Sequence, residues 1–264
     1  MQDLQQETLL LCLPFAGAGA SFFRAWRGAP PGLRIDPVQL PGREGRFREE
    51  PLRSMRAVVD DAFASTIERG GGQAVALFGH SLGAVLAFEL ALRYIEEGHE
   101  VTRLFVSGSP TPWKPRALRA TGLVDDNAFI RKVNEFAGYS HPALEDPEMR
   151  ELLLPTLRAD VALYEDSYRL KPVRLPVPVT AIRGTHDELV GQAQCLAWAE
   201  ATSVGLRVAE VPGGHMYLAD TSSELLKLVS EHLHDDLSPN MESERQACSP
   251  ATSSGWTNPV HPSP

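Results

Sequence analysis

The segment Gly79-His80-Ser81-Leu82-Gly83 constrains the fold more than any other part of the sequence. It lies between an apolar run at 74–78 and a helical pattern at 84–97. In a Gly-x-Ser-x-Gly turn, the chain reverses sharply at the end of a buried strand and leaves the serine hydroxyl exposed. The outer glycines let strand and helix cross where a β-carbon would clash. The segment therefore predicts a buried strand, a nucleophilic serine at Ser81 and a helix, in that order.

Short apolar runs alternate with helical patterns along much of the chain. The runs are 8–13, 35–40, 74–78, 101–107, 177–183 and 206–211, and the helical patterns are 52–68, 84–97, 192–201 and 222–233. The runs are mostly apolar without strict alternation, as expected of strands covered on both faces. The predicted class is α/β, with a mostly parallel central sheet, flanking helices and right-handed crossovers.

Residues 124–171 interrupt this alternation, because they contain two helical patterns, 125–135 and 147–168, and no strand candidate. They are either an extra helical layer or a lid over Ser81, and the length of the insertion favours a lid. Residues 238–264 are rich in Ser, Pro, Thr and Asn. Such a tail buries too little apolar area to order itself, so we predict one domain over 1–237 and a disordered tail.

Composition argues against several classes of protein. The formal net charge of −9 opposes nucleic-acid binding, and no apolar stretch is long enough to cross a bilayer. The apolar segment 9–20 lacks the basic leader of a secretory signal. The three cysteines, Cys12, Cys195 and Cys248, are widely spaced and suggest neither a disulfide framework nor a zinc site. We expect a cytoplasmic monomer.

A serine nucleophile needs a base, and the base needs a carboxylate that orients it. His215 is the predicted base, because it follows the apolar run 206–211 and a Pro-Gly-Gly turn, at a strand's carboxyl end. The histidine of the serine turn, His80, should point away from that base. The other histidines lie at less suitable places, namely His99, His141, His186, His232, His234 and His261.

The predicted acid is Asp187, which follows the run 177–183 and precedes His215 in the chain. Its neighbour Glu188 is the rival. The order serine, acid, histidine is the one expected when a Gly-x-Ser-x-Gly turn follows a strand of an α/β sheet. The segment after the preceding strand, 107–110, offers no carboxylate, and this favours Asp187.

An oxyanion hole needs two backbone N–H donors. One is expected from Leu82, the residue after the nucleophile. The other is expected from the small-residue loop at 14–19, at Ala16 or at its neighbour Phe15. This loop lacks the phosphate-binding and dinucleotide patterns, so we expect no cofactor and no metal.

Several segments together resemble a known family. They are Leu13-Pro14-Phe15-Ala16-Gly17, Gln39-Leu40-Pro41-Gly42-Arg43-Glu44, Gly79-His80-Ser81-Leu82-Gly83, Leu154-Pro155-x-Leu157-Arg158-Ala159-Asp160 and Gly213-Gly214-His215. Over about 8–233, the chain resembles the type II thioesterases, discrete α/β-hydrolases that accompany polyketide and nonribosomal peptide synthases. It departs from them in having Glu188 where a proline often follows the acid, and in its Ala-Gly-Ala-Gly first loop.

The resemblance implies an editing enzyme that hydrolyses acyl thioesters on the phosphopantetheine arm of acyl or peptidyl carrier proteins. It places the nucleophile, acid and base at Ser81, Asp187 and His215, and makes the insertion a lid. Carrier proteins are generally acidic, so Arg43, Arg46 and Arg48 are candidates for docking, although nearby glutamates make a solvated mixed-charge surface as plausible. A general carboxylesterase or lipase, or a non-catalytic binding protein, remains the alternative.

Overall fold

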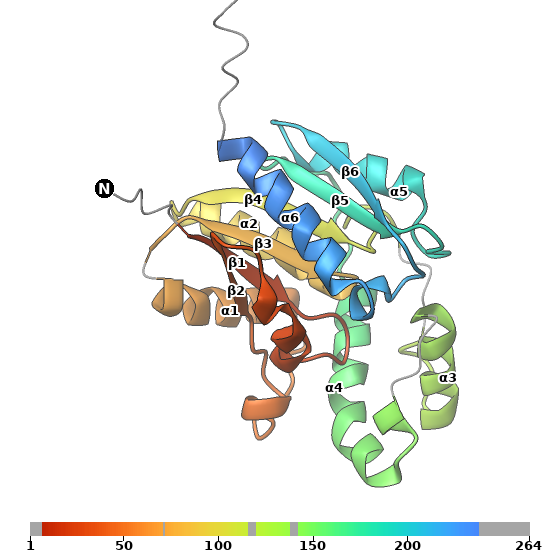
Figure 1. Ribbon diagram of the computed structural model, residues 1–264. Helices are drawn as coiled ribbons and strands as arrows, with labels where there is room; N and C mark the ends of the chain where they lie inside the picture. Colours follow the sequence, from red (N-terminus) through yellow and green to blue (C-terminus); the bar gives the residue numbers. More distant parts are fainter. Residues whose placement is uncertain (1–6, 71, 116–119, 138–141, 238–264) are drawn as a thin grey trace, which may run out of the picture.

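The computed structural model describes residues 7–70, 72–115, 120–137 and 142–237. These contain a six-stranded sheet in the order β2-β1-β3-β4-β5-β6, in which every neighbouring pair is parallel (Figure 1). The strands are β1 (Thr8–Leu13), β2 (Leu33–Pro37), β3 (Val75–His80), β4 (Val101–Ser107), β5 (Val179–Gly184) and β6 (Leu206–Val211). The predicted α/β class with a parallel sheet is confirmed. The predicted tail disorder and Cys248 lie outside the described residues.

Helices cover both faces of the sheet. They are α1 (Met55–Gly70), α2 (Leu82–Glu96), α3 (Asp126–Ala137), α4 (Pro147–Glu165), α5 (Gln192–Leu196) and α6 (Ser222–Leu237), with the 3-10 helices η1 (Ala20–Gly28), η2 (Glu44–Arg46), η3 (Pro142–Leu144), η4 (Ala197–Ala201) and η5 (Tyr217–Ala219). Alternate side chains of β1 enter different cores: Leu9 and Leu11 belong to the core that contains α1 and α2, whereas Leu10 and Cys12 belong to the core that contains η1 and α6. A strand buried on both faces explains the continuous apolar run.

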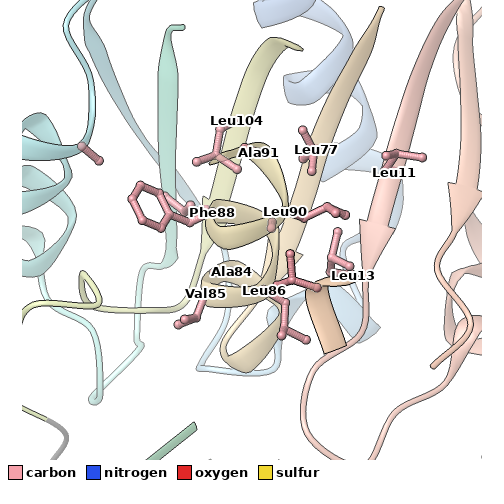
Figure 2. Close-up of a cluster of buried hydrophobic side chains, with 14 of the residues drawn as sticks. Leu11, Leu13, Leu77, Ala84, Val85, Leu86, Phe88, Leu90, Ala91 and Leu104 are labelled. Atoms are coloured by element: carbon pink, nitrogen blue, oxygen red, sulfur yellow. The ribbon is translucent and has the colours of Figure 1, made fainter. Parts of the chain in front are cut away.

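Helix α2 is apolar on nearly all sides, because it packs directly beneath the centre of the sheet. Figure 2 shows Leu86 and Leu90 of this helix beside Leu13 and Leu77 of the strands. This helix begins directly after the serine turn and is buried along most of its length. The packing of α2 against the sheet therefore helps to hold the serine turn in place.

The boundaries of three strands, β1, β4 and β6, agree with the predictions, whereas β2 ends at Pro37 instead of 40. Proline lacks the N–H that a continuing ladder needs. After it, Val38 makes one further backbone bond, to Cys12 O at 2.9 Å, and the chain then turns away although Leu40 stays buried. Apolar content alone did not mark the end of this strand.

The insertion at 124–171 contains α3, η3 and α4, which project beyond one end of the sheet (Figure 1). It forms a small separate core with Ala120, the residue near its start; the members from the insertion are Phe129, Ile130, Leu144, Leu154, Leu157 and Val161. Asp146 caps the amino end of α4, and its carboxylate accepts a hydrogen bond from Met149 N at 2.9 Å. Its carboxyl-terminal part returns to the main core through Leu163 and Tyr164, so this helix joins the insertion to the sheet.

Candidate active site

Ser81 lies at the turn between β3 and α2 with a backbone φ of 54° and ψ of −116°. A positive φ is strained for a residue with a β-carbon and persists only where the surroundings enforce it. Its N–H donates to Ser107 O at 2.8 Å, which continues the pairing with β4. The turn therefore holds the Ser81 side chain at the carboxyl end of the sheet, as the sequence predicted.

The two glycines of the turn are required by close backbone approach. A β-carbon at Gly79 would lie 1.9 Å from Gly83 O, and one at Gly83 would lie 2.4 Å from Leu13 O. Both distances are far below van der Waals contact with rigid backbone. The second contact also shows that the start of α2 lies directly against the end of β1, where the loop containing Ala16 begins.

His215 and Asp187 come together from the ends of β6 and β5. His215 Nδ1 lies 3.0 Å from Asp187 Oδ2, and both side chains are buried. The other carboxylate oxygen, Oδ1, accepts the N–H groups of Leu189 at 2.9 Å and Val190 at 3.1 Å. Glu188 is exposed. This pair has the geometry of a base whose tautomer and orientation are set by a carboxylate.

Burial raises the pKa of Asp187, but the hydrogen bond and charge of His215 and the two backbone donors lower it by more. Its pKa therefore lies below the ordinary aspartate value. The carboxylate stays ionised at neutral pH, which is the state that accepts an N–H bond from His215 and stabilises a protonated imidazole.

The sequence predicted that His80 points away from His215, and this prediction is wrong. The centroids of the two rings are 4.8 Å apart. The His80 ring fits over Gly108, where a β-carbon would lie 2.4 Å from Cε1. Its Nδ1 lies 2.7 Å from Ser107 Oγ, which also hydrogen-bonds the Tyr217 hydroxyl. Burial, and then the charge of His215, keep the pKa of His80 well below the ordinary histidine value. His80 is therefore a neutral packing partner, and sequence reasoning missed Ser107 and Tyr217.

The two predicted oxyanion donors lie on adjoining segments. In the described part of the chain, the N–H groups of Leu82 and Ala16 make no hydrogen bond to another residue. The N–H of Leu82 lies in the first turn of α2, where a helix leaves its N–H groups unpaired. Neither N–H is therefore occupied by an acceptor of the described residues, as the role of oxyanion donor requires.

Comparison with known proteins decides what kind of enzyme this is. Residues 8–236 match the thioesterase domain family. The chain belongs to the thioesterase family. It is a serine hydrolase that cleaves thioesters, and the predicted α/β-hydrolase fold is confirmed by its structural neighbours.

Three relatives illustrate the likeness. The gramicidin S biosynthesis protein GrsT of Aneurinibacillus migulanus is 35% identical over 88% of this chain and 91% of its own. Thioesterase PikA5 of Streptomyces venezuelae is 35% identical over 85% of this chain and 80% of its own. The type II thioesterase BorB from the borrelidin biosynthetic cluster superimposes with a TM-score of 0.77, at 32% identity, over 86% of this chain and 92% of that chain. The resemblance to type II thioesterases is confirmed.

A cavity of about 500 Å³ adjoins His215 in this thioesterase. Its walls come from the segment after β4, from the insertion through Phe136 and Tyr164, and from α5 and the loop before it. Of the other aromatic residues of the insertion, Phe129 is fully buried in the insertion core and Tyr168 is exposed. Tyr139 lies outside the described residues. The insertion therefore contributes both a wall of the cavity and a core of its own.

The three arginines proposed for docking differ in their surroundings. Arg43 is buried and forms a bidentate ion pair with Asp160. Arg46 is held by Glu49 and Asp61, each through two hydrogen bonds. Arg48 is exposed and lies over the ring of Phe47, 5.5 Å from its centroid. Because a buried guanidinium cannot meet a partner, Arg43 does not fit the docking role that the sequence suggested.

The described residues show neither a metal-binding cluster nor a membrane-spanning helix. They contain no group of three or more His, Cys, Asp or Glu side chains placed to hold a metal ion. Among the helices of residues 7–237 that the structure describes, none is long and apolar enough to span a membrane. Cys12 and Cys195 are buried free thiols.

Proposed function

We propose that this thioesterase removes acyl groups from the phosphopantetheine arm of acyl or peptidyl carrier proteins in polyketide or nonribosomal peptide biosynthesis. The hydrogen-bonded His215–Asp187 pair, at the sheet edge where Ser81 stands in its strained turn, supports the chemistry. The relatives support the setting, because GrsT belongs to gramicidin S biosynthesis and BorB to the borrelidin cluster.

The proposed reaction has two halves. His215 takes the proton of the Ser81 hydroxyl as its oxygen attacks the thioester carbonyl, and the resulting oxyanion accepts the N–H groups of Leu82 and Ala16. The C–S bond breaks, and the protonated His215 gives its proton to the departing thiolate of the carrier arm. Water, deprotonated by His215, then attacks the acyl-serine, and the acid leaves as Ser81 regains its proton.

In this proposal the insertion acts as a lid. Phe136 and Tyr164 border the cavity beside His215, so they are placed to contact the acyl group or the arm that carries it. Closing such a wall over the reacting carbonyl excludes water and strengthens the oxyanion interaction.

The decisive experiment measures release of acyl groups from an acylated carrier protein by wild type and by Ser81→Ala. We expect the variant to fold normally and to lose at least about 10³-fold in rate, because removal of a nucleophile leaves only binding and oxyanion stabilisation. Undiminished hydrolysis by Ser81→Ala would refute the mechanism. A higher specificity constant for a simple oxyester than for the acyl-carrier thioester would refute the substrate and favour a general esterase.

A further inference from the structure

Two of the sequence segments that carry the family resemblance meet in the structure through one ion pair. Arg43 of the loop after β2 and Asp160 of α4 form a bidentate pair, with Nη1–Oδ2 at 2.7 Å and Nη2–Oδ1 at 2.8 Å. The side chains are only 7% and 4% exposed. A fork of this kind fixes orientation as well as distance.

The same two side chains hold the loop after β1. Asp160 Oδ2 accepts the N–H of Gly17 at 2.8 Å, and Arg43 Nη1 donates to Ala18 O at 2.8 Å. Asp160 thus binds the N–H of Gly17, and Arg43 binds the C=O of the next residue, Ala18. The loop is fastened on either side of the Gly17–Ala18 peptide, immediately after Ala16.

Packing from α4 supports this fastening. Leu157, one turn before Asp160, places Cδ1 only 3.1 Å from where a β-carbon of Gly17 would lie. Gly17 also has a φ of 77°, which a residue with a side chain would adopt only under strain. The backbone here is therefore set against α4 with no room to move toward it.

We propose that Arg43 and Asp160 are positioning residues for the oxyanion hole, which hold the Ala16 N–H toward the reacting carbonyl and make its position depend on how α4 is seated. The inference rests on the proposed role of Ala16. A buried ion pair is a poor source of stability, because the cost of removing both charges from water offsets their attraction. Its use here is geometric, since an oxyanion donor works only when it is preorganised within a fraction of an ångström.

The test is turnover of a small soluble acyl thioester by Asp160→Asn and Asp160→Ala. The asparagine variant keeps an oxygen that accepts from Gly17 but loses the charge that holds Arg43. The alanine variant loses both. We expect kcat to fall by about 10-fold in Asp160→Asn and about 100-fold in Asp160→Ala, while KM stays within about threefold, because the lost interaction matters in the transition state.

The matched control is Thr156→Val on the same helix. Thr156 Oγ1 donates to Gly42 O at 2.7 Å, a hydrogen bond that ties α4 to the loop after β2 and does not involve the loop after β1. We expect this variant to melt at a lower temperature than wild type and to keep its kcat. All rates are taken at a temperature where circular dichroism shows each variant to be folded.

The outcomes separate this inference from the proposed function. If Ser81→Ala abolishes turnover but folded Asp160→Ala keeps the wild-type kcat, the positioning role is overturned and the mechanism stands. If Asp160→Asn and Thr156→Val lower kcat equally, the pair is only structural and the inference also fails. If Ser81→Ala retains turnover, the mechanism itself is wrong.

Discussion

Ser81 is placed by backbone packing, whereas the loop after β1 is held by two side chains, Asp160 of the insertion and Arg43 of the loop after β2. On the sheet side, Gly79 and Gly83 allow contacts that no other residue would fit, and α2 is buried along nearly its whole length. On the insertion side, the Arg43–Asp160 pair ties α4 to the loop after β1. The nucleophile is thus fixed by the fold itself, whereas the loop that we propose completes the oxyanion hole depends on a helix with a separate small core.

One scaffold can in this way combine a constant nucleophile with a substrate cavity whose wall is held by separate contacts. Backbone contacts in a close-packed core have a single arrangement. Polar side-chain contacts can be broken and remade without unfolding the sheet. Substitutions on the sheet side should therefore abolish activity or folding, and those on the insertion side should change turnover or substrate selection by smaller factors.

The largest effect is expected from Gly79→Ala. The added β-carbon would overlap Gly83 O, so the turn must open and Ser81 must move. We expect no measurable turnover and a loss of about 4 kcal/mol or more in the free energy of unfolding, measured by urea denaturation. Gly122→Ala is the control, because nothing lies within 4 Å of its added carbon in the loop that leads into the insertion. Wild-type turnover by Gly79→Ala would show that the turn tolerates adjustment.

Asp187→Asn should have the next largest effect. An amide in place of the carboxylate presents an N–H to His215 Nδ1 and favours the wrong imidazole tautomer. We expect kcat to fall by about 10³- to 10⁴-fold with a retained fold. The control is Glu188→Gln, which removes the neighbouring exposed carboxylate and should leave kcat unchanged. If Glu188→Gln were the more damaging of the two, the acid would be Glu188.

The sequence predicted most of what local patterns determine. Ser81, Asp187 and His215 each follow a recognisable strand, and the parallel sheet brings the carboxyl ends of those strands to one edge. The pairing of Arg43 with Asp160 was not predicted, because 117 positions separate the two residues and neither lies in a periodic pattern that reports its partner. The inward turn of His80 was missed for the same reason, since Ser107 on another strand holds its ring.

On the insertion side, Phe136→Ala should change binding more than turnover. The ring of Phe136 borders the cavity, 6.5 Å from the His215 ring and 6.4 Å from that of Tyr164. Loss of its apolar contact, about 1–2 kcal/mol, should raise KM for long apolar acyl thioesters by about 10-fold. Leu152→Ala on α4 is the control, because Leu152 is 66% exposed. A fall in kcat at unchanged KM would place Phe136 with the catalytic groups instead.

The lowered pKa of Asp187 predicts a pH effect on the sheet side. Because the folded pKa lies below that of the unfolded chain, the ionised carboxylate stabilises the fold. That contribution is complete above the ordinary aspartate pKa of about 3.9, and is lost as pH falls through the lower folded value. The difference in unfolding free energy between wild type and Asp187→Asn should therefore shrink below about pH 4 in urea titrations. A difference that stays constant into acid would contradict the lowered pKa.

The smallest effect concerns docking, which we propose rests on Arg48 rather than on Arg43 or Arg46. Arg48 is exposed and forms no ion pair with the described residues, so its charge is available to an acidic carrier protein. A rim charge acts mainly on encounter. We therefore expect Arg48→Glu to raise KM for an acylated carrier protein by about 2- to 5-fold at low salt, and to leave KM for a small soluble thioester unchanged.

Lys227→Glu is the control for this experiment, because it makes the same change in charge on α6. This helix covers the face of the sheet opposite to the one covered by α1 and α2. If both reversals raise KM for the carrier equally, the effect is one of net charge and Arg48 has no special place. If Arg48→Glu raises KM for both substrates alike, the arginine acts on the active site and not on docking. Only a carrier-specific effect that weakens at high salt, where exposed charges are screened, would support an electrostatic docking surface beside η2.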